Sequence, residues 1–230
     1  MRVLGLVPAR GGSRRVPRKN LIRLAGVTLV RRALQSALAA DCFDTVALSS
    51  EDPEILAEAA GLDGVALVER PPELAGDSAR AYDVAVHAIG EVERRGPGRF
   101  DAVAVIQCTS PFTEPGDLAG AVELLARTGA GSVVSVVRVE ASAHPLKLKR
   151  MEGERLLPYL EDDRMTPSHE LPPLWVRNGS IYVSRRELID TGTFIADDVR
   201  GYAMPSERSY DIDTPRDVAF AEFLLERGLR

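Results

Sequence analysis

The segment PARGGSRRVPRKN, from Pro8 to Asn20, concentrates cationic side chains on a loop with two adjacent glycines. Its cations are Arg10, Arg14, Arg15, Arg18 and Lys19. Glycine leaves backbone N–H groups free to wrap around an anion, and cationic side chains can neutralise its charge. The loop matches neither GxxxxGK[ST] nor GxGxxG, so it is not a standard P-loop or dinucleotide fingerprint. Two interpretations stay open: a cradle for a triphosphate, or a solvated basic loop.

A second chemical signal lies near the end of the sequence, in SYDIDTP. In an extended segment Asp211 and Asp213 point to one side, while Ile212 turns toward the core. Mg²⁺ is bound through one or two carboxylates together with substrate phosphates, which a nucleoside triphosphate supplies. The alternative is that Asp213 only helps to cap the final helix.

Weaker signals follow other apolar segments. Gln107 ends the segment DAVAVIQ, where its amide can donate to and accept from a base edge or a sugar. Arg70 follows GVALVE and is either a phosphate or base contact or a surface arginine. Asn178 and Gly179 form either a tight turn or a bulge. Lys147, in HPLK, either meets an anionic acceptor or belongs to a plain loop.

Strand-like and helix-like segments alternate along the first 140 residues. Expected strands are 3–7, 44–50, 64–69, 101–107 and 132–139, and expected helices are 28–40, 51–60, 78–95 and 115–127. This order predicts an α/β fold with a doubly wound, mostly parallel sheet, in which ligands gather at the carboxyl ends of the strands. A further strand at 174–184 and a short strand leading into a helix near Pro215 complete the expected elements.

The pattern becomes irregular between residues 141 and 174, where prolines and charge clusters interrupt any helical period. Such a texture suits an extended arm or hairpin, which would serve as a lid or as a subunit contact. We interpret residues 1–230 as one domain with this arm inside it, because the length suits one sizeable core.

The overall composition excludes several classes of function. The net charge is −5, and the chain lacks basic stripes with interleaved aromatic residues, which argues against a nucleic-acid partner.

The apolar run before Pro8 is too short for a signal peptide, and no stretch approaches the ~20 apolar residues of a membrane span. Cys42 and Cys108 lack metal-binding spacing and favour reduced thiols in the core. We expect a cytoplasmic protein without a membrane partner.

Taken together and in order, six motifs resemble the acylneuraminate cytidylyltransferase family, which includes the CMP-sialic acid synthetases. The motifs are ARGGSRRVPRKN, RPPELAGDSA, QCTSP, HPLK, RNGSIY and SYDIDTPRD, and they cover essentially the whole chain. The resemblance implies a Rossmann-like nucleotidyltransferase fold and a CTP-dependent reaction. In that reaction the hydroxyl of a sugar acid attacks the α-phosphate, pyrophosphate leaves and Mg²⁺ holds the triphosphate.

The resemblance also assigns roles to individual positions. The implied CTP-binding residues are Ala9, Arg10, Gly11, Gly12, Ser13, Lys19, Asn20, Arg70 and Gln107, with Arg10 and Lys19 also catalytic. Asp211 and Asp213 would hold Mg²⁺ and share in catalysis. The implied acceptor-binding residues are Lys147, Ser168, Asn178 and Tyr182, and the arm at 141–174 would make the protein a homodimer.

The chain departs from the family pattern where the acceptor is expected. Ser168 stands where the family usually has an arginine that meets the sugar carboxylate, and a hydroxyl cannot replace that bidentate partner. Cys108 replaces a usual proline, and Ala81 a serine. The resemblance makes a sialic or related nonulosonic acid the leading acceptor, and Ser168 keeps open a sugar phosphate or phosphonate as the same-fold alternative. A non-catalytic nucleotide-binding protein is the remaining hypothesis.

Overall fold

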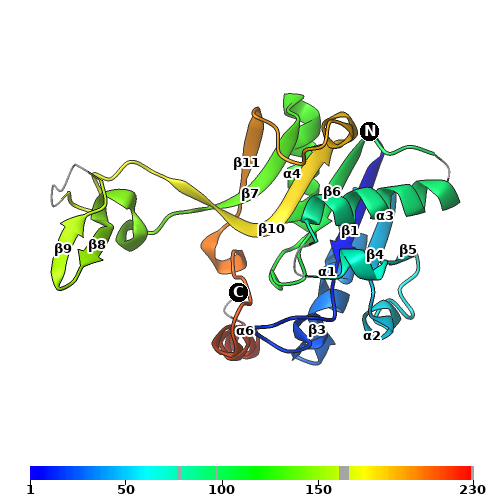
Figure 1. Cartoon of the computed structure of the whole chain (residues 1–230), viewed down its shortest axis with the longest axis horizontal. Helices are drawn as coiled ribbons and strands as arrows, with labels where there is room; N and C mark the ends of the chain where they lie inside the picture. Colours follow the sequence, from blue (N-terminus) through cyan, green and yellow to red (C-terminus); the bar gives the residue numbers. More distant parts are fainter. Residues whose placement is uncertain (77–78, 97, 161–165, 229–230) are drawn as a thin grey trace.

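The computed structural model describes residues 1–76, 79–96, 98–160 and 166–228. Its centre is a seven-stranded sheet in the order β11-β7-β10-β6-β1-β4-β5 (Figure 1). The strands are β1 Val3–Pro8, β4 Thr45–Ser50, β5 Val65–Glu69, β6 Ala102–Ile106, β7 Ser132–Arg138, β10 Trp175–Arg185 and β11 Val199–Ala203. Only β10 runs antiparallel to its neighbours, β6 and β7. The expected mostly parallel sheet is confirmed.

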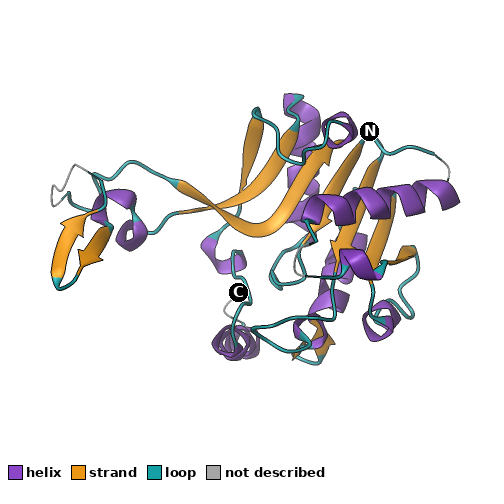
Figure 2. Cartoon of the chain, in the orientation of Figure 1, coloured by secondary structure: helices purple, strands orange, loops and turns teal. Residues whose placement is uncertain are grey.

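Helices cover both faces of this sheet (Figure 2). Leu34 of α1 (Leu29–Ala39) and Leu125 of α4 (Pro115–Thr128) belong to the core on one face, together with Ala221 of α6 (Pro215–Arg227). Ala85 of α3 (Ala81–Arg95) and Ile189 of α5 (Arg186–Asp190) belong to the core on the other face. The short helix α2 spans Pro53–Ala57. Two cores on opposite faces are what a doubly wound arrangement requires.

Local sequence explains where several helices begin. The Thr28 side chain accepts a hydrogen bond from the Arg31 amide at the start of α1, and Thr214 and Asp217 form a capping box on α6. The helix expected over 51–60 is shorter, ending at Ala57. The helix expected to begin at Ser78 begins at Ala81, after Arg80 as its extended N-cap residue; residues 77 and 78 lie outside the described part of the chain.

The irregular segment forms an arm that extends away from the sheet (Figure 1). It carries a hairpin of β8 (Lys149–Glu152) and β9 (Arg155–Pro158), although residues 161–165 lie outside the described residues. The hairpin exposes apolar side chains: Met151 is 71% exposed and Leu156 is 64% exposed. The twisted ends of β7 and β10 connect the arm to the sheet.

Asn178 and Gly179 form a β-bulge, which resolves the choice between a turn and a bulge. The register of β10 against β7 shifts between Arg177 and Tyr182, and Gly179 has a φ of 80°. Only glycine adopts this left-handed conformation at little cost. The bulge lies where β10 leaves the sheet for the arm, next to the carboxyl end of β6.

One helix and three strands were not expected from the sequence. They are the short helix α5, the two-residue strands β2 (Arg23–Leu24) and β3 (Val27–Thr28), and the edge strand β11. Conversely, the expected short strand at SYDID is wrong: after a 3-10 turn at Ser206–Arg208, the backbone through Asp213 has no regular structure. Ile212 is nevertheless fully buried, and its N–H donates to the Thr109 carbonyl at 2.8 Å. The Ile212 side chain and this backbone hydrogen bond thus help to hold a segment that has no regular structure.

Candidate active site

A cavity of about 280 Å³ opens at the carboxyl ends of β1, β5 and β6. It is lined by Pro8, Arg10, Ser13, Lys19, Asn20, Arg70, Ala79, Ala81, Val84, Gln107, Cys108 and Thr109. Six of these residues are among the predicted CTP-binding positions. Ala81 and Cys108 are two of the positions where the chain departs from the family pattern. The sequence carried no chemical signal for Pro8, Ala79, Val84 and Thr109, because a residue in the wall of a cavity needs only a suitable shape.

The basic loop and the acidic segment meet beside this cavity. Lys19 Nζ donates to the Ile212 carbonyl at 2.8 Å and lies 3.2 Å from Asp213 Oδ1, and Arg15 Nη1 donates to Asp213 Oδ2 at 2.9 Å. The interpretation of Asp213 as only a helix cap is wrong, since Thr214 and Asp217 cap α6. Lys19 is only 14% exposed, so this part of the loop is not simply solvated.

The backbone of the glycine loop is partly occupied by protein groups. The Gly11 N–H donates to Glu51 Oε1 at 2.7 Å, and the Ala9 N–H donates to the Ser49 carbonyl at 2.9 Å. Ala9 is almost fully buried and is not among the residues that line the cavity. An anion that used the Gly11 amide would therefore have to displace the Glu51 carboxylate.

Asn20 and Arg70 hold the cavity in shape. Asn20 Nδ2 donates to the Arg10 carbonyl at 2.9 Å, which fixes the loop where Arg10 projects from it. Arg70 is 5% exposed, donates to the Ser49 carbonyl at 2.8 Å and lies 4.0 Å from Glu51 Oε2. Burial lowers the pKa of its guanidinium, and the nearby Glu51 carboxylate opposes that effect. Arg70 is thus a buried cation at a strand end rather than a surface residue.

Cys108 forms part of the wall where the family usually has proline. Its thiol is 2% exposed, and burial raises its pKa to about 12. The neighbouring cations Arg70 and Lys19 act in the opposite direction but do not offset burial. Cys108 is therefore an inert packing residue, as expected from the sequence.

A second cavity of about 290 Å³ adjoins the first. It is lined by Ala81, Tyr82, Val105, Gln107, Tyr182, Phe194 and Ile195. Ala81 and Gln107 line both cavities, so the two share a wall. The predicted acceptor residue Tyr182 thus lies beside the predicted nucleotide residue Gln107. Phe194 and Ile195 lie between α5 and β11, two elements that the sequence did not reveal.

Asn178 lies close by but is already engaged. It accepts a hydrogen bond from Ser135 Oγ at 2.6 Å through Oδ1, and its Nδ2 donates to Ser209 Oγ at 2.9 Å. Ser209 precedes Asp211 by two residues. Asn178 therefore ties the bulge of β10 to the acidic segment, and an acceptor contact would compete with these bonds.

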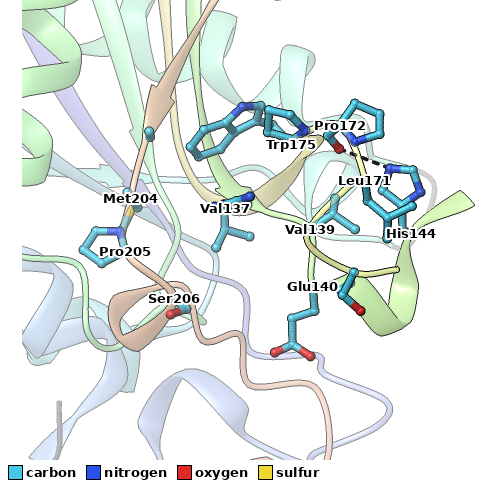
Figure 3. Close-up of a pocket in the computed structure, with 15 residues that line it drawn as sticks. Val137, Val139, Glu140, His144, Leu171, Pro172, Trp175, Met204, Pro205 and Ser206 are labelled. Carbon is cyan, nitrogen blue, oxygen red and sulfur yellow. Dashed lines mark hydrogen bonds between the residues drawn. The ribbon is translucent and has the colours of Figure 1, made fainter. Parts of the chain in front are cut away.

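Lys147 and Ser168 lie apart from the other predicted site residues, on the arm. Lys147 Nζ donates to Ser168 Oγ at 2.8 Å. Ser168 also lines a cavity of about 660 Å³ between the arm and the sheet, in which Trp175 and His144 lie across from Met204, Pro205 and Ser206 (Figure 3). Within one chain the structure does not bring Lys147 or Ser168 to the cavities at the carboxyl edge.

Asp211 and Asp213 offer carboxylate oxygens, which are suitable ligands for Mg²⁺. No group of three or more His, Cys, Asp or Glu side chains is arranged as a metal site within the described ranges. Mg²⁺ does not need one, because one or two carboxylates and substrate phosphates suffice. Asp211 is exposed, and Asp213 is 46% exposed beside the cavity, so the pair fits a metal bound together with a triphosphate.

A doubly wound sheet that gathers cations, a carboxylate pair and a polar cavity at its carboxyl edge is the architecture of a nucleotidyltransferase. Comparisons support this class. The sequence profile of the family described as Cytidylyltransferase matches residues 4–157. The protein is 31% identical to the CMP-N,N'-diacetyllegionaminic acid synthase of Legionella pneumophila, over 98% of this chain and 97% of that protein. It is 35% identical to N-acylneuraminate cytidylyltransferase A of Danio rerio, over 96% of this chain but 50% of that protein.

The fold is also shared with a solved structure, CMP:2-keto-3-deoxy-manno-octonic acid synthetase complexed with CTP. The TM-score is 0.72 at 17% identity, covering 99% of this chain and 100% of the other. The chain belongs to the cytidylyltransferase family, and the resemblance to acylneuraminate cytidylyltransferases is confirmed. No helix in the described part of the chain has the length and hydrophobicity to span a bilayer.

Proposed function

We propose that the protein transfers CMP from CTP to a hydroxyl group of a nonulosonic acid and releases pyrophosphate. The observation that carries the proposal is the meeting of Lys19 with Asp213 beside a cavity that shares Gln107 with a second cavity. One substrate can thus lie against cations and carboxylates while the other lies against Tyr182. The names of the relatives, which include a CMP-legionaminic acid synthase, support this choice of acceptor.

The chain's own residues position and neutralise rather than form a covalent intermediate. Arg10 and Lys19 would bind the triphosphate, with the Gly12 and Ser13 backbone beside it, and Arg70 and Gln107 would orient the nucleoside. Asp211 and Asp213 would hold Mg²⁺, which supplies charge neutralisation to the phosphates when it is bound. Phosphoryl transfer needs mainly positioning and electrostatic stabilisation, which such a site provides.

We further propose that the protein is a homodimer. Lys147 and Ser168 lie on an arm that leaves its own sheet, and the hairpin exposes Met151, Leu156 and Tyr159 to solvent. Exposed apolar side chains on an extended hairpin are typical of a subunit contact. Lys147 would then act in the acceptor site of the partner chain. Residues 1–230 would remain one domain, with 141–174 as its dimerisation arm.

The second candidate function is nucleotidyl transfer to a sugar phosphate or phosphonate. It is favoured by Ser168, because Lys147 bonded to a hydroxyl offers a monodentate site that suits a phosphoryl group as well as a carboxylate. It requires the same nucleotide cavity and differs only in the acceptor.

Pyrophosphate release separates these candidates. The protein is supplied with Mg²⁺, each of the four nucleoside triphosphates, and N-acetylneuraminic acid, N,N'-diacetyllegionaminic acid, a sugar phosphate or a phosphonate. We expect turnover with CTP and a nonulosonic acid. We expect Lys19→Met and Asp213→Asn to lower kcat/KM at least a hundredfold, while Arg127→Met, an exposed cation on α4, leaves it unchanged. Turnover only with another nucleotide would refute the choice of CTP.

A further inference from the structure

Two arginines lie on the ribbon of β7 and β10 that connects the sheet to the arm. Arg177 pairs with Val136 in the antiparallel register, and Trp175 pairs with Arg138. Residues directly opposite in an antiparallel ladder share a face, and residues two apart on one strand share it too. Arg138 and Arg177 are therefore diagonal neighbours on one face of the ribbon. The diagonal spacing of such pairs is about 7–8 Å.

The same face continues into the second cavity. Tyr182 pairs with Val134, which lies two residues before Val136 on β7. Tyr182 and Arg177 are thus on the same face in successive rows, even though the bulge inserts extra residues between them on β10. Two residues of a strand span about 7 Å. The long side chain of arginine can cross that distance, so Arg177 is placed to reach the opening of the cavity that Tyr182 lines.

Within the described part of the chain, neither guanidinium has a partner. Arg138 and Arg177 are exposed, and no ion pair or hydrogen bond joins either of them to the described residues. Glu140 lines the larger cavity together with Arg138, but its carboxylate accepts from Ser142 Oγ at 3.5 Å and does not pair with the arginine. The two positive charges repel each other across the diagonal, although solvent screens charges that are both exposed. No contact among the described residues compensates for this repulsion.

The position where the family pattern places an arginine carries no guanidinium. Ser168 has no cationic group of its own, and its hydroxyl accepts a hydrogen bond from the Lys147 ammonium. A carboxylate is bound most strongly by the planar fork of arginine, which a hydroxyl cannot imitate. An acceptor held against Tyr182 would meet Arg177 first and Arg138 next along the same face.

We propose that Arg177, assisted by Arg138, is the receptor for the carboxylate of the acceptor. This inference rests on the proposed function, since it assumes an acidic sugar in the cavity lined by Tyr182. It assigns substrate specificity to a residue that the family pattern does not single out. The carboxylate would then be recognised on the ribbon of β7 and β10 and not at the tip of the arm.

The test compares Arg177→Gln, Arg138→Gln and the control Arg127→Gln, an exposed arginine on α4. Three KM values are measured: that for CTP, that for the best nonulosonic acid at saturating CTP, and that for the methyl ester of the same acid at saturating CTP. We expect Arg177→Gln to raise the KM of the acid tenfold or more and Arg138→Gln to raise it about threefold, with the KM for CTP unchanged. The wild type should discriminate strongly between acid and ester, and Arg177→Gln should lose most of that discrimination.

Melting temperature gives the structural control. Because removal of one charge relieves repulsion, neither glutamine variant should melt below the wild type. An unchanged KM for the acid in Arg177→Gln, with an active wild type, overturns this inference and leaves the proposed function standing. A wild type that turns over no sugar acid with CTP overturns the proposed function, and a wild type that prefers a phosphorylated acceptor overturns the assignment of a carboxylate.

Discussion

Arg208 donates two hydrogen bonds to the carboxylate of Asp117, from Nε to Oδ2 at 2.9 Å and from Nη2 to Oδ1 at 2.8 Å. Asp117 is 1% exposed at the start of α4, and Arg208 precedes Asp211 by three residues. The hydrogen bonds to Asp117 raise the pKa of Arg208. The pair thus ties the first turn of α4 to the segment that carries Asp211.

Arg208→Met should destabilise the protein by about 3 kcal/mol, because it leaves the buried Asp117 carboxylate without its partner. The free energy of unfolding in urea measures this. The control is Arg200→Met, which breaks a more exposed ion pair with Asp198 and should cost no more than about 1 kcal/mol. An equal loss of unfolding free energy in the two variants would show that the buried pair with Asp117 stabilises the protein no more than an exposed ion pair does.

Arg15→Ala should strengthen the binding of Mg²⁺. Arg15 is 72% exposed, and its guanidinium pairs with Asp213 Oδ2, which a metal ion would also use. Exposed ion pairs contribute about 0.2–1 kcal/mol, so their removal should lower the half-saturating Mg²⁺ concentration by up to about fivefold. Titration of pyrophosphate release with Mg²⁺ tests this; a higher Mg²⁺ requirement in the variant would contradict it.

Gly11→Ala and Gly12→Ala form a matched pair within one loop. A Cβ at Gly11 would lie 2.4 Å from Asp52 Oδ2, whereas a Cβ at Gly12 meets nothing within 4 Å. Asp52 caps α2 and pairs with Arg18, so its displacement disturbs both contacts. We expect Gly11→Ala to cost about 1–3 kcal/mol and Gly12→Ala less than about 0.5 kcal/mol in urea unfolding. Similar values for both would mean that Asp52 moves aside freely.

Cys108 should resist alkylation in the folded protein. With a pKa of about 12, its thiolate fraction at pH 8 is roughly one part in ten thousand, and the sulfur is buried. Iodoacetamide at pH 8, followed by mass spectrometry, should leave Cys108 unmodified until urea unfolds the chain. Cys42→Ser removes the other thiol and makes the assignment direct. Rapid modification without urea would show that this wall of the cavity opens.

Much of the fold could be predicted because its elements carry strong local patterns. The residues of β6 are all buried, so an unbroken apolar run sufficed to identify a central strand. Elements stabilised mainly by tertiary contacts were missed. The edge strand β11 is largely exposed and contains Gly201, and two-residue strands such as β2 have no periodicity to detect.

The sequence predicted which residues form the candidate site better than it predicted the contacts between them. Six predicted CTP-binding residues line one cavity, because parallel strands place their carboxyl ends at one edge. The occupation of the Gly11 amide by Glu51 depends on the side-chain position of another loop, which no local pattern encodes. Similarly, Asn178 was interpreted as an acceptor contact, but its partners Ser135 and Ser209 are distant in sequence.

Ala81 and Gln107, as the shared wall of two adjoining cavities, have a consequence for the kinetics of the enzyme. A product that joins nucleotide to sugar must occupy both compartments at once, and neither substrate can enter while it remains. The product is therefore expected to inhibit competitively against CTP and against the acceptor alike. Product release is then expected to be the slowest step of the catalytic cycle.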